Sequence, residues 1–292
     1  MRAVKYLLFI LISLIVGCSL IKTSYNSAPK LVIWWLDDYF DLNQSQQLVL
    51  EPALQGLHNW HRQHQLPQHI EQLKSFQISL DANNLTAQTV CNQIQSAKIT
   101  VYALQTQSIP AILKLALLLD DKQLSRFEQK LDKRTQKWKK EWWQNSKEDQ
   151  LSVRLDKAED FAEKVYGDIN AEQLTLIKQR LILANSNPEK SYNEILRRNI
   201  DAFNILKALK TPKPANINGK EFDDSAIDLV QAGFDRMQKS PNADYQQYVN
   251  TLNSHSCETV AALHATTNEK QRLRAKNWIN EYIVQLTALQ AK

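Results

Sequence analysis

Apolar side chains recur every three or four residues along most of the chain, which is the period of one face of an α-helix. The pattern is clearest over residues 120–147, where the apolar positions are Leu124, Phe127, Leu131, Trp138 and Trp142. Similar spacing predicts further helices over residues 151–165, 174–184, 192–206, 222–239, 242–253 and 268–289. We find no run that alternates apolar and polar residues as a strand does. The sequence therefore predicts an all-α protein.

The composition supports this fold class. Of the 292 residues 43% are hydrophobic, so the chain can bury a core and is not a disordered polypeptide. Only 5 residues are glycine, fewer than a Rossmann fingerprint, a phosphate-binding loop or a glycine-turned β-barrel requires. We expect an extended antiparallel helical bundle over residues 29–292. Pro212, Pro214 and Gly219 indicate a break between subdomains at residues 210–221.

A helix-start signal occurs four times: an Asn or Asp is followed three residues later by Gln. The copies are Asn43–Gln46, Asp120–Gln123, Asn170–Gln173 and Asn268–Gln271. This spacing is typical of a capping box, in which the first side chain accepts from a helix amide and the second reaches back to the cap amide. The pattern also resembles the Leu-Thr-x-x-Gln motifs of the Spy and CpxP periplasmic chaperones, with Asn or Asp in place of Thr. We favour the capping interpretation.

The N-terminus has the features of an export signal. Arg2 and Lys5 precede an apolar run over residues 7–16, which is too short for a comfortable membrane span. Residues 15–18, Ile-Val-Gly-Cys, resemble a bacterial lipobox. We therefore expect a signal peptide at 1–17, acylation of Cys18 and a polar tether over 18–28, rather than an uncleaved anchor. By resemblance to sorted lipoproteins, Ser19 favours the periplasmic face of the outer membrane.

The charge balance gives no support to nucleic acid as a partner. The formal charge is +5, and removal of Arg2 and Lys5 with the signal peptide lowers it to +3. Residues 120–147 hold 9 Lys or Arg and 5 Asp or Glu, so this predicted helix is basic. Such a stripe suits contact with anionic lipid headgroups. A solvated face is the simpler interpretation.

Two cysteines remain after Cys18. In an exported protein, Cys91 and Cys257 are expected to form a disulfide, although two buried free thiols are the alternative.

Residues 34–42 combine two tryptophans with three aspartates. One interpretation places the rings in the core and pairs the carboxylates with Lys or Arg. A second makes the aromatic residues a binding surface, with Trp34, Trp35 and Tyr39 as candidates. A third makes Asp37, Asp38 and Asp41 a source of paired carboxylates for acid–base catalysis. In the basic segment, the corresponding binding candidates are Trp142 and Trp143.

Three histidines lie three residues apart, at His58, His61 and His64. Neighbouring pairs have a spacing that suits a shared metal ion. His58 and His64 point away from each other on a helix, so we favour a polar helix face. We expect no metal and no cofactor.

The chain resembles an uncharacterised lipoprotein family of Gram-negative bacteria, domain of unknown function 6279. The residues that carry this resemblance are the lipobox, 35–42 with Gln46, 60–62, 66–67, 256–257, His264 and 271–272. The resemblance implies that the protein is located in the cell envelope, and it does not imply any particular activity.

The sequence leads us to expect a non-enzymatic protein, either a chaperone-like binder of unfolded clients or an accessory to an envelope protein. An envelope hydrolase that uses Asp37, Asp38 or Asp41 is one alternative, and a structural spacer is the other.

Overall fold

The computed structural model describes residues 22–80, 85–143, 146–210 and 222–290. Within these ranges the chain is almost entirely helical and has no strand, which confirms the predicted all-α fold. The elements are α2 (Ala28–Phe40), α3 (Gln44–Trp60), the π-helical turn η1 (His61–Gln65), α4 (Leu66–Ser79), α5 (Ala87–Leu118), α6 (Asp121–Trp142), α7 (Lys147–Tyr166), α8 (Ala171–Leu183), α9 (Pro188–Leu209), α10 (Asp224–Gln238), α11 (Ala243–Ala265) and α12 (Glu269–Gln290). Cys18, the signal peptide and the predicted break at 210–221, apart from residue 210, lie outside the described residues.

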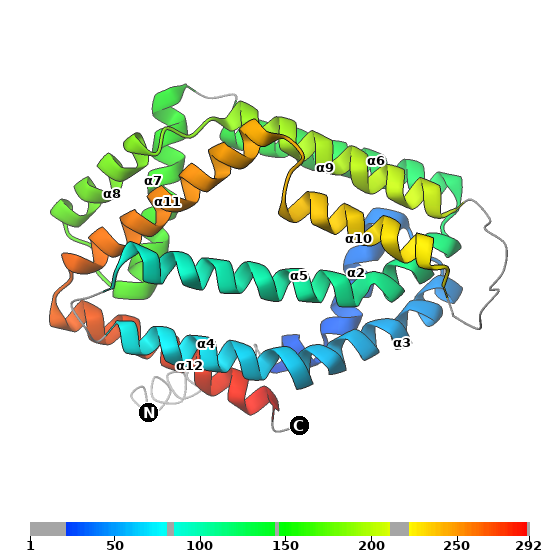
Figure 1. The fold of residues 1–292 in the computed structure, drawn as a ribbon, viewed down its shortest axis with the longest axis horizontal. Coiled ribbons are helices and arrows are strands. Elements are labelled where there is room, and N and C mark those ends of the chain that lie inside the picture. The colour runs from blue at the N-terminus through cyan, green and yellow to red at the C-terminus, as the bar shows by residue number, and fades with distance from the viewer. Residues whose placement is uncertain (1–21, 81–84, 144–145, 211–221, 291–292) are drawn as a thin grey trace, which may run out of the picture.

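Helix α5 runs through the middle of the elongated body (Figure 1). One hydrophobic core gathers α2, α3, α6, α9 and α10 against its C-terminal half. A second core gathers α4, α7, α8, α11 and α12 around its N-terminal half. By length and composition α5 qualifies as a membrane span, but its contacts on both cores are those of a central helix in a folded domain. The two cores therefore share one axial helix.

The predicted disulfide is present. Cys91 on α5 and Cys257 on α11 are bonded, with their Cα atoms 5.5 Å apart. Cys257 is fully buried in the second core. The bond fastens α11 to the first turns of α5, across a sequence separation of 166 residues.

The segment expected to be a tether is folded in its second half. Residues 22–26 are helical, and the ring of Tyr25 lies 4.6 Å from that of His58. The Tyr25 hydroxyl and Nδ1 of His61 share a hydrogen bond of 2.9 Å. Arg62 adds a bond of 2.6 Å to the side chain of Asn26. Residues 22–28 therefore belong to the folded body, because aromatic and polar contacts hold them on α3 and η1.

All four helix-start signals form the expected caps, and the glutamines also pair two by two. Gln46 and Gln123 each accept a backbone amide at their own helix start. Their side-chain amides then bond to each other, with Nε2 to Oε1 distances of 2.9 and 2.8 Å. The second amide hydrogen of Gln46 reaches the carbonyl of Leu118, and that of Gln123 reaches the carbonyl of Asp41. One glutamine pair thus joins the starts of α3 and α6 to the ends of α5 and α2.

The same arrangement recurs in the second core. Gln173 and Gln271 bond reciprocally, at 3.0 and 2.9 Å. Gln173 also donates to the carbonyl of Thr266, and Gln271 to that of Asp168. This pair joins the starts of α8 and α12 to the ends of α11 and α7. A primary amide supplies two N–H donors and an oxygen that accepts two hydrogen bonds, so each glutamine bonds to its partner and also satisfies an orphan amide and an orphan carbonyl.

We expect Gln173→Met to lower the free energy of unfolding by about 1–3 kcal/mol. The thioether keeps the shape of the side chain but leaves the Thr266 carbonyl and the Asn170 amide without their buried partner. The measurement is the urea midpoint. Glu172→Gln, at the exposed neighbouring position, is the matched control and should leave the midpoint unchanged. An equal midpoint for Gln173→Met would show that the pair does not stabilise the fold.

Replacement of both bridged cysteines by alanine should also destabilise the protein. The chain-entropy model gives an upper value of about 5 kcal/mol for a loop of this length. Urea unfolding of the double variant, compared with the oxidised wild type, measures the loss. If reduced and oxidised wild-type protein unfolded at the same urea concentration, the bond would have no stabilising role.

Candidate functional site

The three aspartates of residues 37–41 have different structural roles. Oδ1 of Asp37 accepts the backbone amide of Leu42 at 2.8 Å, which closes the end of α2. Asp38 forms an ion pair with Lys130, and that lysine lowers the pKa of Asp38. Asp41 adopts a left-handed conformation with φ of 55°, and its carbonyl accepts from Gln123. Asp37 and Asp38 are therefore engaged in local structure, and the arrangement does not present two carboxylates to a common cleft.

The aromatic candidates on α2 separate into exposed and buried residues. Trp34 is 72% exposed and Trp35 is 49% exposed, whereas Tyr39 is only 4% exposed. The Tyr39 hydroxyl accepts a hydrogen bond from Arg134, and its ring lies 4.7 Å from that of Trp35. The two tryptophans are available on the surface. Tyr39 is a core residue, because its position on the helix turns it toward α6.

Trp35 lies at the edge of a pocket of about 260 Å³, which we call the apolar pocket. Its walls come from α2, α5, α6, α9 and α10, and they include Leu36, Phe127, Ala202, Ile205, Phe234 and Met237. The pocket is partly open to solvent, and almost all of its surface is hydrocarbon. Gly233 lets α10 approach α9, because a Cβ at this position would clash with the Cδ1 of Ile205.

A charged network lies beside this pocket. Arg197 and Arg198 line the pocket, and both bond to the buried carboxylate of Glu194. Burial alone would raise the pKa of Glu194, but the hydrogen bonds from these arginines and from Ser240 outweigh it and lower that pKa. Asp201 is held by Arg236 at 2.7 Å. The network fastens α9 to α10, so the apolar walls keep their spacing.

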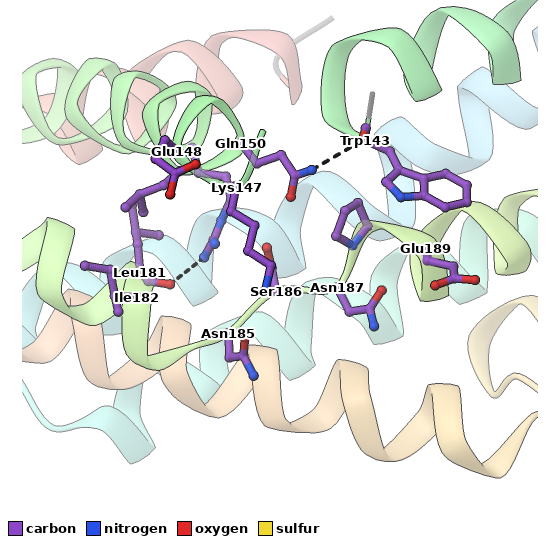
Figure 2. Close-up of a pocket in the computed structure, with 13 residues that line it drawn as sticks. Trp143, Lys147, Glu148, Gln150, Leu181, Ile182, Asn185, Ser186, Asn187 and Glu189 are labelled. Atoms are coloured by element: carbon purple, nitrogen blue, oxygen red, sulfur yellow. Dashed lines mark hydrogen bonds between the residues drawn. The ribbon is translucent and has the colours of Figure 1, made fainter. Parts of the chain in front are cut away.

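A second hollow, which we call the polar pocket, lies between α7 and the segment that joins α8 to α9 (Figure 2). Its volume is about 480 Å³, and its walls are mixed. Trp143 lies on one side, where Gln150 donates to its carbonyl at 3.3 Å. Arg154 donates to the carbonyl of Leu181 at 2.9 Å, and burial lowers the pKa of that arginine.

The second pair of aromatic candidates lies near this pocket. Trp143 lines it, with Nζ of Lys139 4.9 Å from its ring centroid. Trp142 is half-buried beneath Lys157. Lysine side chains thus cover the rings of Trp143 and Trp142, which the sequence indicated as candidates for a binding surface. The polar pocket offers amide and charged side chains, but it lacks the apolar depth that usually gives a ligand site its affinity.

Three of the four histidines at positions 58–69 cluster beside Tyr25: His58 is buried, and His61 and His69 are half-buried, whereas His64 is exposed, as a polar helix face requires. His58 is buried beneath Tyr25, and neither of its ring nitrogens has a hydrogen-bond partner among the described residues. His61 lies 5.9 Å from His69, and burial, with smaller contributions from His69 and His58, lowers its pKa to about 4. In the described ranges no group of three or more His, Cys, Asp or Glu is placed to hold a metal ion.

The comparisons with known proteins bear on these residues only in part. The model of the family of unknown function DUF6279 matches residues 38–232. The chain belongs to this family. The comparisons with curated proteins and with solved structures give no match. The match contains most walls of the apolar pocket, including Phe127 and Ala202, but it does not reach Trp35.

Sequence reasoning missed the contribution of α9 and α10 to the site. The sequence signal for this contribution is a set of charged residues on one face of a helix. Arg197, Arg198 and Asp201 follow Glu194 by three, four and seven residues. Without the fold, that spacing indicates only surface ion pairs. Burial of Glu194 and its contact with Ser240 after α10 depend on tertiary packing.

We expect acid to loosen the contact between Tyr25 and the histidine cluster. Since the folded pKa of His61 is about 4 and its ordinary value is 6.5, the unfolded chain binds the proton more tightly. Stability should therefore fall as the pH drops below about 6.5 and continue to fall toward about 4. Urea midpoints across this range measure the slope.

His61→Asn removes the titrating group while keeping a polar atom near the position of Nδ1. It should reduce the slope of the urea midpoint against pH, and the remainder comes from His58, His69 and His264, whose pKa values burial also lowers. His255→Gln on α11 should leave the slope unchanged. An identical slope in His61→Asn and wild type would exclude His61 as the source.

Proposed function

We propose that the protein is a periplasmic lipoprotein of the outer membrane that acts by binding, and that the apolar pocket receives an apolar side chain from a segment of another protein. The lipobox before Cys18 and the Ser19 that follows support this location at the outer membrane. The observation that carries the binding role is a partly open pocket with nearly pure hydrocarbon walls, bordered by an exposed indole. Transfer of an apolar side chain from water into such a pocket is favourable.

A chaperone-like role fits this geometry better than catalysis. Unfolded chains expose apolar segments, and a rigid pocket with one open side selects apolar chemistry rather than a particular sequence. The hydrolase alternative requires two of the aspartates at 37, 38 and 41 in one cleft, and Asp37 and Asp38 are held by Leu42 and Lys130. An accessory role toward one envelope protein uses the same pocket with a single occupant.

The test fills the pocket. Ala202→Phe places a ring among the apolar walls, and it should weaken binding of a hydrophobic fluorescent probe such as N-phenyl-1-naphthylamine by about tenfold or more. The same variant should lose the ability to suppress aggregation of a reduced, unfolded model client. Fluorescence titration and light scattering are the measurements.

Ala208→Phe is the matched control, because Ala208 is exposed on the same helix. It should bind the probe as the wild type does. Trp35→Ala serves as a second variant that removes a wall without overfilling the pocket, and it should weaken binding too. Normal probe binding by both pocket variants would contradict the proposal. Probe binding without suppression of aggregation would favour a single partner over a chaperone role.

A further inference from the structure

Helix α2 exposes an unusual number of apolar side chains within one turn and a half. Leu31 is 48% exposed, and Val32, Trp34 and Trp35 are also exposed. Trp34 and Trp35 follow Leu31 by three and four residues, so all three lie on one side of the helix. The opposite side, with Leu36 and Phe40, packs on the core. Trp35 packs partly on Tyr39 and the apolar pocket, whereas Leu31, Val32 and Trp34 are not among the side chains of the first core.

A basic stripe on α6 borders this apolar side. Arg126, Lys130, Lys133, Arg134 and Lys137 fall within about 100° of arc on an ideal helix. The acidic residues Asp121, Glu128 and Asp132 lie on the other side of the helix, and Glu141, near its C-terminal end, forms an ion pair with Lys157 of α7.

Direct contacts place the stripe beside α2. Arg126 donates to the carbonyl of Asp38 at 3.3 Å, and Lys130 pairs with the Asp38 carboxylate. Arg134 bonds to the Tyr39 hydroxyl. Cations and exposed indoles thus share one surface.

The short stretch of chain between Cys18 and α2 limits how far this surface can lie from Cys18. Leu31 follows Cys18 by thirteen residues, which span at most ~45 Å when extended. Because residues 22–28 are folded onto α3 and η1, the free length is shorter still. An acyl group on Cys18 would therefore hold the exposed side of α2 close to the membrane.

We propose that the α2–α6 face, formed by Leu31, Val32 and Trp34 with the cations Lys133 and Lys137, lies on an anionic phospholipid surface. Indole and aliphatic side chains occupy the interface between headgroups and acyl chains, and lysines pair with the headgroup phosphates. This inference rests on the lipid anchor of the proposed function. The contact orients the body, so that the protein is held at the membrane by a face as well as by acyl chains.

The experiment uses the lipidated protein purified from cells and inserted into vesicles of phosphatidylethanolamine and phosphatidylglycerol. Bromine atoms on the acyl chains quench tryptophans that enter the interface. We expect strong quenching in the wild type and a clear loss of it in Trp34→Ala, with the remainder from Trp35 on the same side of the helix. Trp142→Ala, at the far end of α6, is the matched control and should leave the amplitude of the quenched fluorescence unchanged. Trp34 is chosen because it does not line the apolar pocket, whereas Trp35 does.

The charge contribution is tested separately. Lys133→Glu with Lys137→Glu should reduce quenching in vesicles that contain phosphatidylglycerol, and so should added salt. Lys178→Glu, an exposed lysine on α8, is the control and should have no effect.

These experiments distinguish failure of the lipid anchor from failure of the membrane contact of α2. A mass spectrum that shows Cys18 without acyl groups would overturn the anchor and this inference with it. A lipidated Cys18 together with equal quenching in Trp34→Ala and wild type would overturn only the membrane contact of α2.

Discussion

The structure depends on two reciprocal glutamine pairs, each of which ties four helix ends together. Every helix end leaves amides or carbonyls without partners, and four ends that meet in one place concentrate this cost. Gln46 and Gln123 supply partners for these amides and carbonyls in the first core, and Gln173 and Gln271 do so in the second. All four side chains are buried, so each bond forms without competition from water. The pairs fix which helices cross, and the hydrophobic cores fill the space between them.

The first pair also positions the apolar pocket. Gln123 bonds to the carbonyl of Asp41, the residue that ends α2, so the end of α2 is held against the start of α6. Trp35 and Leu36 border the pocket from that helix, and Phe127 borders it from α6. On the far side, Arg197 and Arg198, which are paired with Glu194, donate to the carbonyls of Arg236 and Met237 and so hold α9 against α10. A pocket with both sides fixed keeps its shape when empty, which lowers the cost of binding.

The sequence predicts the helices and caps well because they depend on local spacing. The starts of α6 and α8 follow from Asp120 and Asn170, and the pairing of Cys91 with Cys257 follows from the cysteine count together with the expected export signal. Local spacing does not show that the capping glutamines bond to each other, since this needs residues 77 positions apart to meet. The same limit applies to the burial of His58 beneath Tyr25 and to the apolar pocket, whose walls come from five helices.

The central claim is that the apolar pocket receives a segment of another protein in the envelope. The most direct measurement is photo-crosslinking in intact cells, with a photoreactive residue at Trp35, because Tyr39 is buried and Trp35 is exposed at the edge of the pocket. The account predicts protein adducts that disappear when Ala202→Phe fills the pocket and persist in Ala208→Phe. Adducts that are unaffected by Ala202→Phe, or their absence in the unfilled protein, would contradict it.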